Sequence, residues 1–169
     1  MISPFTIPFV GLKLGQHSFE FSIDKTFFES LPYSLVENGN LVVKLNLEKK
    51  ETMLVASFSV KGEVSVPCAR CNDDMSQKIK GDLTVYYVFG DEESEDENLI
   101  VIPRESYEID VQQSIYEMIM LALPSRSAHK KNECNEEMVQ LLEKYMTQHD
   151  SKDDEDNIDP RWAALKNLN

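Results

Sequence analysis

Cys68 and Cys71 are the residues whose types and spacing most directly suggest chemistry. A Cys-x-x-Cys sequence can bring two thiols close enough to share a metal ion or to react as a pair. A redox role would need a thiolate stabilised by a helix start or by nearby cations. Arg70 is one such cation, but Asn72-Asp73-Asp74 follows and indicates no helix start. Metal binding, inert free thiols and redox chemistry therefore stay open on these residues.

The histidines give no support for hydrolytic catalysis. His17, His129 and His149 stand in no recognisable nucleophile motif, and the 6 glycines form no phosphate-binding loop. We therefore expect a protein that is not an enzyme.

The only tryptophan, Trp162, lies beside Arg161 near the C-terminus and follows a stretch rich in acidic residues. Pro160, which suits a first helical position, and the sequence Ala163-Ala164-Leu165-Lys166 predict a short helix. One interpretation is that Trp162 packs on the protein's own core and fixes the tail. The other is that residues 159–169 form a recognition segment that packs on a partner or stacks on a base.

Length and composition indicate one soluble domain with tails. The 169 residues are 41% hydrophobic, as expected for a packed core with polar appendages. No apolar run approaches the roughly 20 residues of a membrane-spanning helix, and the first residues lack the pattern of a secretory signal. Three cysteines cannot all pair within one chain, which argues against a disulfide scaffold. We expect a cytoplasmic protein without a membrane partner.

A net charge of −13 opposes binding to nucleic acid, but the distribution of the charge changes that inference. Residues 91–97 contribute −6 and residues 150–156 contribute −4, which leaves −3 for all other residues. The body of the protein is therefore close to neutral. The two acidic runs are either solvated loops, or they hold a basic protein or compete with RNA for a basic surface.

Periodicity predicts a sheet-rich first half and a helical second half. Asp24 precedes a short helix over 25–31, and Asn38-Gly39 is a turn signal. Residues 79–89 keep one apolar parity with Gly81 as the interruption, so the cysteines lie at the tip of a long antiparallel hairpin. Strands are expected at 5–10, 18–23, 43–47, 54–66 and 79–89, with an edge strand at 99–102.

Two longer helices are expected after the sheet. The first is capped by Asp110, runs to Pro124 and is buried on most sides, with Leu121 in its widened apolar face. The second is amphipathic and begins at Asn135 with the stripe Met138, Leu141, Leu142 and Tyr145. The predicted class is α+β: a mostly antiparallel sheet, a buried helix, an amphipathic helix and a short C-terminal helical segment. The expected divisions are a domain at 1–147, an acidic flexible linker at 148–158 and a terminal segment at 159–169.

Four separated motifs follow one another along the chain: Cys68, Arg70 and Cys71; Ile109 to Val111; Leu121-Ala122-Leu123-Pro124; and Asp159 to Leu165. Their types and order resemble the YceD family, the large ribosomal RNA subunit accumulation proteins. The resemblance implies a non-catalytic role in ribosome production, in which the protein supports the accumulation or maturation of large-subunit (23S) ribosomal RNA. It further implies that the partner is this RNA or a large-subunit ribosomal protein, and not DNA. The resemblance covers roughly residues 60–169.

Proteins similar to this chain carry a second cysteine cluster after the Leu-Ala-Leu-Pro helix, and here that region offers only His129 and Cys134. With Cys68 and Cys71 they make three sulfurs and one imidazole, an accepted tetrahedral zinc shell. These four residues are therefore a candidate zinc site, although the chain departs here from the pattern of two Cys-x-x-Cys pairs. The alternative is free thiols and no cofactor.

If the segments near residues 70 and 130 lie side by side, their basic side chains would also form a patch that contacts RNA phosphates. The alternative is scattered charges on hairpin ends and loops. The candidate RNA- or partner-binding residues are Arg70, Lys78, Lys80, Arg126, Lys130, Lys131, Arg161 and Trp162.

Three functions remain open from the sequence. The first is a ribosome-biogenesis factor that binds large-subunit RNA or a ribosomal protein. The second is an acidic adaptor or chaperone that holds a basic large-subunit protein without touching RNA, and whose binding is salt-sensitive. The third is a small zinc or thiol-redox protein of unrelated function.

Overall fold

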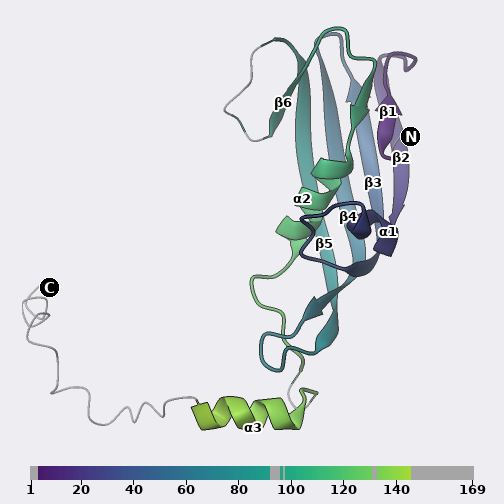
Figure 1. The fold of residues 1–169 in the computed structure, drawn as a ribbon. Helices are drawn as coiled ribbons and strands as arrows, with labels where there is room; N and C mark the ends of the chain where they lie inside the picture. Colours follow the sequence, from purple (N-terminus) through teal and green to yellow (C-terminus); the bar gives the residue numbers. More distant parts are fainter. Residues whose placement is uncertain (1–3, 92–95, 97, 131–132, 146–169) are drawn as a thin grey trace, which may run out of the picture.

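The computed structural model describes residues 4–91, 96, 98–130 and 133–145, and these form seven strands and three helices (Figure 1). The predicted α+β class with a mostly antiparallel sheet is confirmed. The predicted linker at 148–158 and the terminal segment at 159–169 lie outside the described residues. In chain order the elements are β1 (Thr6–Pro8), β2 (Gly15–Ile23), α1 (Lys25–Glu29), β3 (Asn38–Lys49), β4 (Met53–Pro67), β5 (Asp74–Phe89), β6 (Leu99–Ile102), β7 (Glu108–Asp110), α2 (Gln112–Ala122) and α3 (Glu136–Tyr145).

A five-stranded sheet in the order β2-β3-β4-β5-β6 forms the body of the protein. The first four strands are an antiparallel meander, because each pairs with its neighbour in the chain. The predicted edge strand β6 is confirmed, and it runs parallel to β5. Two short strands, β1 and β7, pair separately in antiparallel fashion.

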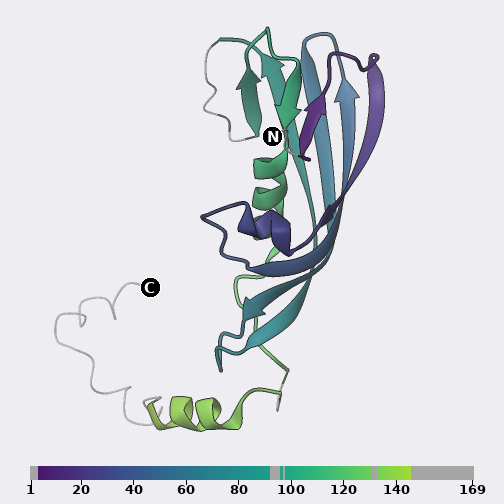
Figure 2. The same ribbon diagram turned by 45° about the vertical axis from the view of Figure 1, so that its right-hand side comes forward.

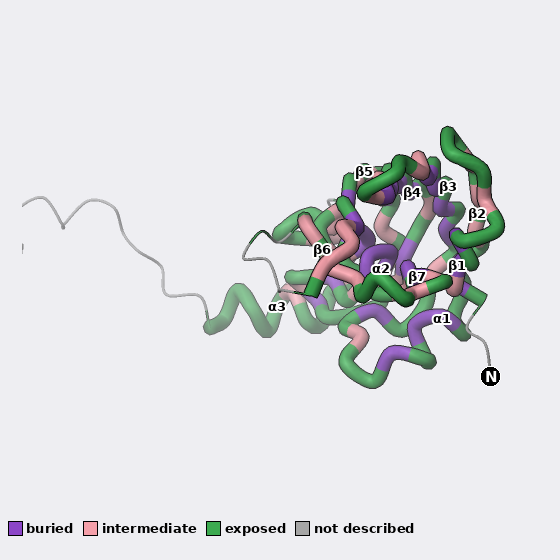
Figure 3. The backbone as a smooth tube through the Cα atoms, turned by 90° about the horizontal axis from the view of Figure 1, so that it is seen from above, coloured by how far each residue is buried: buried purple, intermediate pink, exposed green. Residues whose placement is uncertain are grey.

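One face of the sheet carries the core. Side chains of alternate residues point to opposite faces of a strand, and on β3 to β5 the buried set faces α2 and α1, which lie on the same side of the curved sheet (Figure 2). Viewed from above, the buried residues gather where these helices meet the strands (Figure 3). The outer face of β2 to β5 bears the exposed residues of the same strands. The sheet thus has one packed face and one solvated face.

The predicted turn at Asn38-Gly39 is wrong, because both residues begin β3 and pair with Ser65 and Val64. A Cβ on Gly39 would lie 3.1 Å from the Phe28 ring and 3.1 Å from the Val64 side chain. Glycine is therefore needed here for close packing and not for a turn.

Close packing also explains why position 81 is a glycine. A Cβ at this position would lie 2.8 Å from the Cβ of Ala122, at the end of α2. The interruption in the apolar parity of β5 is thus a point where α2 lies too close to the sheet for a side chain, so Gly81 helps to set the position of that helix.

The helix ends largely follow the predicted signals. Asp24 is the N-cap of α1 and accepts a hydrogen bond from the Thr26 amide at 2.9 Å. Asp110 accepts from the Gln112 amide at 2.8 Å, although the N-cap of α2 is the next residue. The burial of α2 is confirmed for five residues including Ile115 and Ile119, but Leu121 is exposed, since it points away from the sheet side.

The helix α3 begins where predicted, with Asn135 accepting a hydrogen bond from the Glu137 amide at 3.1 Å. None of its residues is buried, and its apolar stripe faces solvent. It lies beyond the tip of the β4–β5 hairpin (Figures 1 and 2). Within the described part of the chain, no helix is both long enough and apolar enough to cross a membrane.

Candidate metal centre

The cysteine pair lies at the tip of the β4–β5 hairpin, as predicted. Pairing in register continues to Pro67 and Asp74, and the six residues between them form the turn. Asn72 adopts a left-handed conformation with φ 62°, which asparagine tolerates better than most residues. Its amide donates to the Cys68 carbonyl at 2.9 Å, and the Cys68 amide donates to the Asp73 carbonyl at 2.9 Å. The backbone thus fixes the tip in a tight loop.

The chain returns to this tip after α2. The Ala69 amide donates to the Ser127 carbonyl at 2.8 Å, and the Arg70 guanidinium donates to the His129 carbonyl. The His129 amide donates to the Cys68 Sγ at 3.4 Å. The hairpin tip and residues 127–129, about sixty positions apart in the sequence, are therefore held together by hydrogen bonds, with donors on both segments.

Four side chains converge between these two segments. The ligand atoms of Cys68, Cys71, His129 and Cys134 all lie within 4.8 Å of one another. The Cys68 and Cys134 Sγ atoms are 3.9 Å apart, and the Cys71 Sγ lies 3.4 Å from the His129 Nδ1. Tetrahedral zinc with bonds of about 2.3 Å to sulfur places ligand atoms about 3.8 Å apart. The two measured separations fit such an ion.

The thiols differ in acidity because their surroundings differ. Burial raises the pKa of Cys68, but backbone hydrogen bonds from Cys71, His129 and Arg70 outweigh it and lower the pKa from 9.0 to about 5. The pKa of Cys71 is likewise lowered by hydrogen bonds despite burial. Cys68 is therefore a thiolate at neutral pH before any metal arrives.

Cys134 behaves in the opposite way. Burial and its hydrogen bonds with Cys68 and Cys71 raise its pKa to about 11. The pKa of His129 is raised, chiefly by its hydrogen bond with Cys71 and against the effect of burial. A third thiolate beside two others needs a cation, and a bound metal ion supplies one. The donor set and its electrostatics therefore fit zinc.

The structure places the predicted basic residues in two groups. Arg70 lies at the tip, and Arg126 and Lys130 are exposed on the segment joined to it. Lys78 and Lys80 lie further along β5, and Lys78 forms an ion pair with Glu63 at 3.6 Å. Lys131, Arg161 and Trp162 lie outside the described residues.

Sequence reasoning missed Lys61, which pairs in register with Lys80 across β4 and β5. The alternation of β4 carried the signal, since Lys61 shares the exposed parity of Ser57 and Ser59. The stabilisation of the Cys68 thiolate was also missed, because it comes from backbone amides and not from a charged neighbour or a helix start.

One of three comparisons with known proteins identifies a family. A profile of the family described as "Large ribosomal RNA subunit accumulation protein YceD" matches residues 56–169, a stretch that contains all four candidate ligands. Comparison with curated proteins and with solved structures gave no match.

Proposed function

The chain belongs to the YceD family of large ribosomal RNA subunit accumulation proteins, and from this premise we propose that it binds large-subunit ribosomal RNA through a zinc-stabilised hairpin tip. It acts without catalysing a reaction, in the cytoplasm, as a factor in large-subunit production. The observation that carries the proposal is the cluster of Cys68, Cys71, His129 and Cys134, because it joins a basic segment to a rigid hairpin.

Zinc at this site has a structural role. Cys68 and Cys71 hold it from the hairpin, while His129 and Cys134 hold it from the segment after α2. The ion supplies the positive charge that lets three thiolates sit together. All four positions are taken by protein groups, as in closed structural sites, so no position is left open for substrate.

The RNA-binding surface consists of Arg70, Arg126 and Lys130. Arg126 and Lys130 are exposed, and they flank His129 on the segment that the cluster fixes. Arginine and lysine side chains bind phosphates and release counterions, which gives RNA affinity that falls with salt. Lys131, Arg161 and Trp162 lie outside the described residues and are further candidate RNA contacts on sequence grounds alone.

A second candidate function is an acidic adaptor for a basic large-subunit protein. The exposed apolar stripe of α3, with Glu136 and Glu137 in its first turn, favours this function. Such a helix face suits a partner that is both apolar and basic. The adaptor predicts strong, salt-sensitive binding to that protein in the absence of RNA.

Cross-linking in cells separates the two functions. RNA attached to the purified protein is sequenced, and attached proteins are identified by mass spectrometry. The variant with Arg126→Glu and Lys130→Glu is compared with a control of equal charge change, Lys13→Glu with Lys25→Glu. We expect large-subunit RNA on the native chain and on the control, and a loss of at least tenfold on the first variant.

Attachment to a basic ribosomal protein without RNA would overturn RNA binding and support the adaptor. Elemental analysis of the purified protein tests the metal separately, with one zinc per chain as the expected result. Its absence from protein purified under reducing conditions would refute the zinc-stabilised tip.

A further inference from the structure

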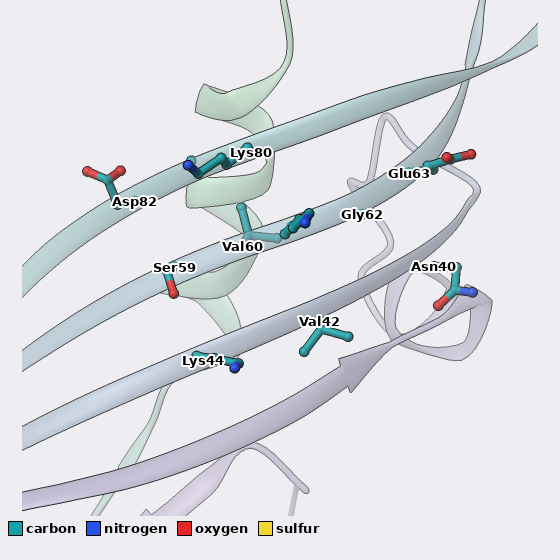
Figure 4. Close-up of a pocket in the computed structure, with 11 residues that line it drawn as sticks. Asn40, Val42, Lys44, Ser59, Val60, Gly62, Glu63, Lys80 and Asp82 are labelled. Carbon is teal, nitrogen blue, oxygen red and sulfur yellow. The ribbon is translucent and has the colours of Figure 1, made fainter.

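The outer face of the sheet carries a hollow that the proposed function does not use. Figure 4 shows Asn40, Val42, Lys44 and Lys80 around it, on strands β3 and β5. The hollow has a volume of about 660 Å³, and its lining also includes Ser59 and Lys61. These outer-face residues have the parity opposite to the buried ones, so the hollow opens on the side of the sheet away from α2.

Two lysines in this hollow oppose each other directly. Lys61 and Lys80 are partners in the register of β4 and β5, and both are exposed. Like charges at directly opposite positions destabilise a sheet. Within the described residues neither ammonium group forms an ion pair, whereas Lys44 pairs with Glu20 at 3.8 Å and Lys78 with Glu63. The pair is therefore a local concentration of positive charge whose ammonium groups form no ion pair with the described residues.

The nearby carboxylates do not remove this charge. Glu63 is occupied, since it accepts a hydrogen bond from the Ser76 hydroxyl at 2.6 Å and contacts Lys78. Asp82 lies two residues from Lys80 on the same face, opposite Ser59, and forms no ion pair within the described part of the chain. Of the residues that line the hollow, Lys61 and Lys80 are the lysines without an ion pair in the described part of the chain, and Asp82 is the carboxylate without one.

An exposed aromatic ring lies on the same face. Tyr86 shares the parity of Lys80 on β5 and its residue is 42% exposed. Six residues of strand separate the two by about 20 Å. Between them lie Asp82 and Thr84, so the face offers positive charge at one end and a ring at the other. Proteins that bind single-stranded nucleic acid combine these two features, with cations for phosphates and rings for bases.

We propose that the outer face of the sheet binds single-stranded RNA, with Lys61 and Lys80 contacting backbone phosphates and Tyr86 stacking on a base. RNA as the partner rests on the proposed function, but the surface differs from the hairpin tip. An acidic peptide would satisfy the lysines and leave the tyrosine ring without a role, so the ring favours RNA.

Fluorescence anisotropy with a labelled single-stranded RNA oligonucleotide tests the surface. The test variant is Lys61→Met with Lys80→Met, and the control is Lys13→Met with Lys25→Met, which removes the same charge from exposed positions elsewhere. We expect the test variant to lose at least tenfold in affinity. The slope of log affinity against log salt should also fall by about 1.4, since each phosphate contact on single strands contributes about 0.7.

Tyr86→Ser sharpens the test. It should weaken binding of the single-stranded oligonucleotide several-fold while leaving the salt slope unchanged, because stacking releases no counterion. A thermal unfolding scan of each variant shows that the fold is intact. Equal losses of affinity in the test and control variants would overturn the proposal. Unchanged affinity in the double variant Lys61→Met with Lys80→Met and in the separate variant Tyr86→Ser would overturn it as well.

The outcomes separate this surface from the hairpin tip. If Arg126→Glu with Lys130→Glu abolishes RNA binding and the sheet variants do not alter it, the sheet proposal fails and the proposed function stands. If the native chain binds polyglutamate more tightly than RNA, and the test variant loses that binding, the occupant is an acidic protein and the proposal fails. If the native chain binds no RNA at all, the proposed function fails and this inference fails with it.

Discussion

The two ends of the β4–β5 hairpin are stabilised by different interactions. Along the body, apolar residues such as Phe58 and Val85 pack on one face against α2 and the rest of the core. At the tip, four ligand atoms within 4.8 Å of one another replace the apolar core. The first kind of stabilisation is spread over many contacts, and the second is concentrated at one point.

The two regions should therefore respond differently to the loss of a single side chain. Hydrophobic packing decreases gradually as single side chains are removed. A metal site can lose its ion when one ligand is removed, because the binding energy is shared by four bonds to one ion. The body should therefore remain folded without metal, and the tip should not remain attached to the segment that carries His129.

Substitution of a single ligand, Cys71→Ser, is expected to have the largest effect. Structural zinc sites contribute about 10–16 kcal/mol of apparent binding energy in small peptides at neutral pH, so loss of one ligand should abolish stoichiometric zinc. Hydrogen exchange should then become fast at the Ala69 amide, which donates to Ser127, and remain slow in β3. Ser76→Ala, near the tip but outside the cluster, is the control. Slow exchange at Ala69 in the Cys71→Ser protein would show that the tip does not need a metal.

Thiol titration of metal-free protein, under reducing conditions, sharpens the contrast within the tip. Ultraviolet absorbance of thiolates should show Cys68 titrating with a pKa of about 5 and Cys134 with a pKa of about 11. Because the folded pKa of Cys68 is below its usual value of 9.0, its contribution to stability is complete above pH 9 and is lost as pH falls towards 5. Cys68→Ser should remove the acidic step and also lower the pKa of Cys134, because a hydrogen bond with Cys68 contributes to raising it. A single transition near pH 9 for all three thiols would contradict the geometry of the cluster.

The body is tested by Ile119→Ala on α2. Ile119 is fully buried against the sheet, and truncation of such a residue costs about 2–5 kcal/mol. Urea unfolding followed by circular dichroism measures the loss. Zinc content should not change, because the ligands do not depend on this contact. If zinc were lost as well, the two ends of the hairpin would not be independent.

Gly81→Val tests the contact that positions α2. The new side chain would meet Ala122, and overpacking of this kind costs about 1–3 kcal/mol. The double variant with Ala122→Gly removes the opposing Cβ and should recover part of the stability in the same urea measurement. Additive losses would mean that the close approach of the helix is not the reason for glycine.

The sequence predicted those features that depend on local periodicity or on short motifs. The alternation on both sides of Cys68 and Cys71 placed them at a hairpin tip, and the family resemblance is confirmed by a profile that covers residues 56–169. Asp24 and Asn135 marked helix starts correctly. The proximity of His129 to Cys71 followed from considering both segments as one ligand set.

Features that depend on tertiary packing could not be predicted in this way. Gly39 has the local signature of a turn, but its reason lies in the Phe28 ring, which only the folded chain brings near. Lys80 is close to Cys71 in sequence, yet the extended strand places it about 20 Å from the start of β5. Its nearest charged neighbour in register is Lys61, on a different strand. Register, which no single strand specifies, determined that pairing.

The smallest effect is expected at the pair of Lys61 and Lys80, where the sign of the change in the free energy of unfolding is informative. Lys61→Met removes a like-charge pair that lies directly opposite in the sheet, so the free protein should gain about 0.2–1 kcal/mol in urea unfolding at low salt. Lys44→Met on the same outer face is the matched control. It introduces the same side chain but removes the exposed ion pair with Glu20, so it should be neutral or lose up to about 1 kcal/mol. The gain for Lys61→Met should shrink as salt is added, because screening weakens the repulsion. A loss of stability would mean that Lys61 supports the fold, whereas a gain would mean that the chain keeps an unfavourable pair that a bound anion can relieve.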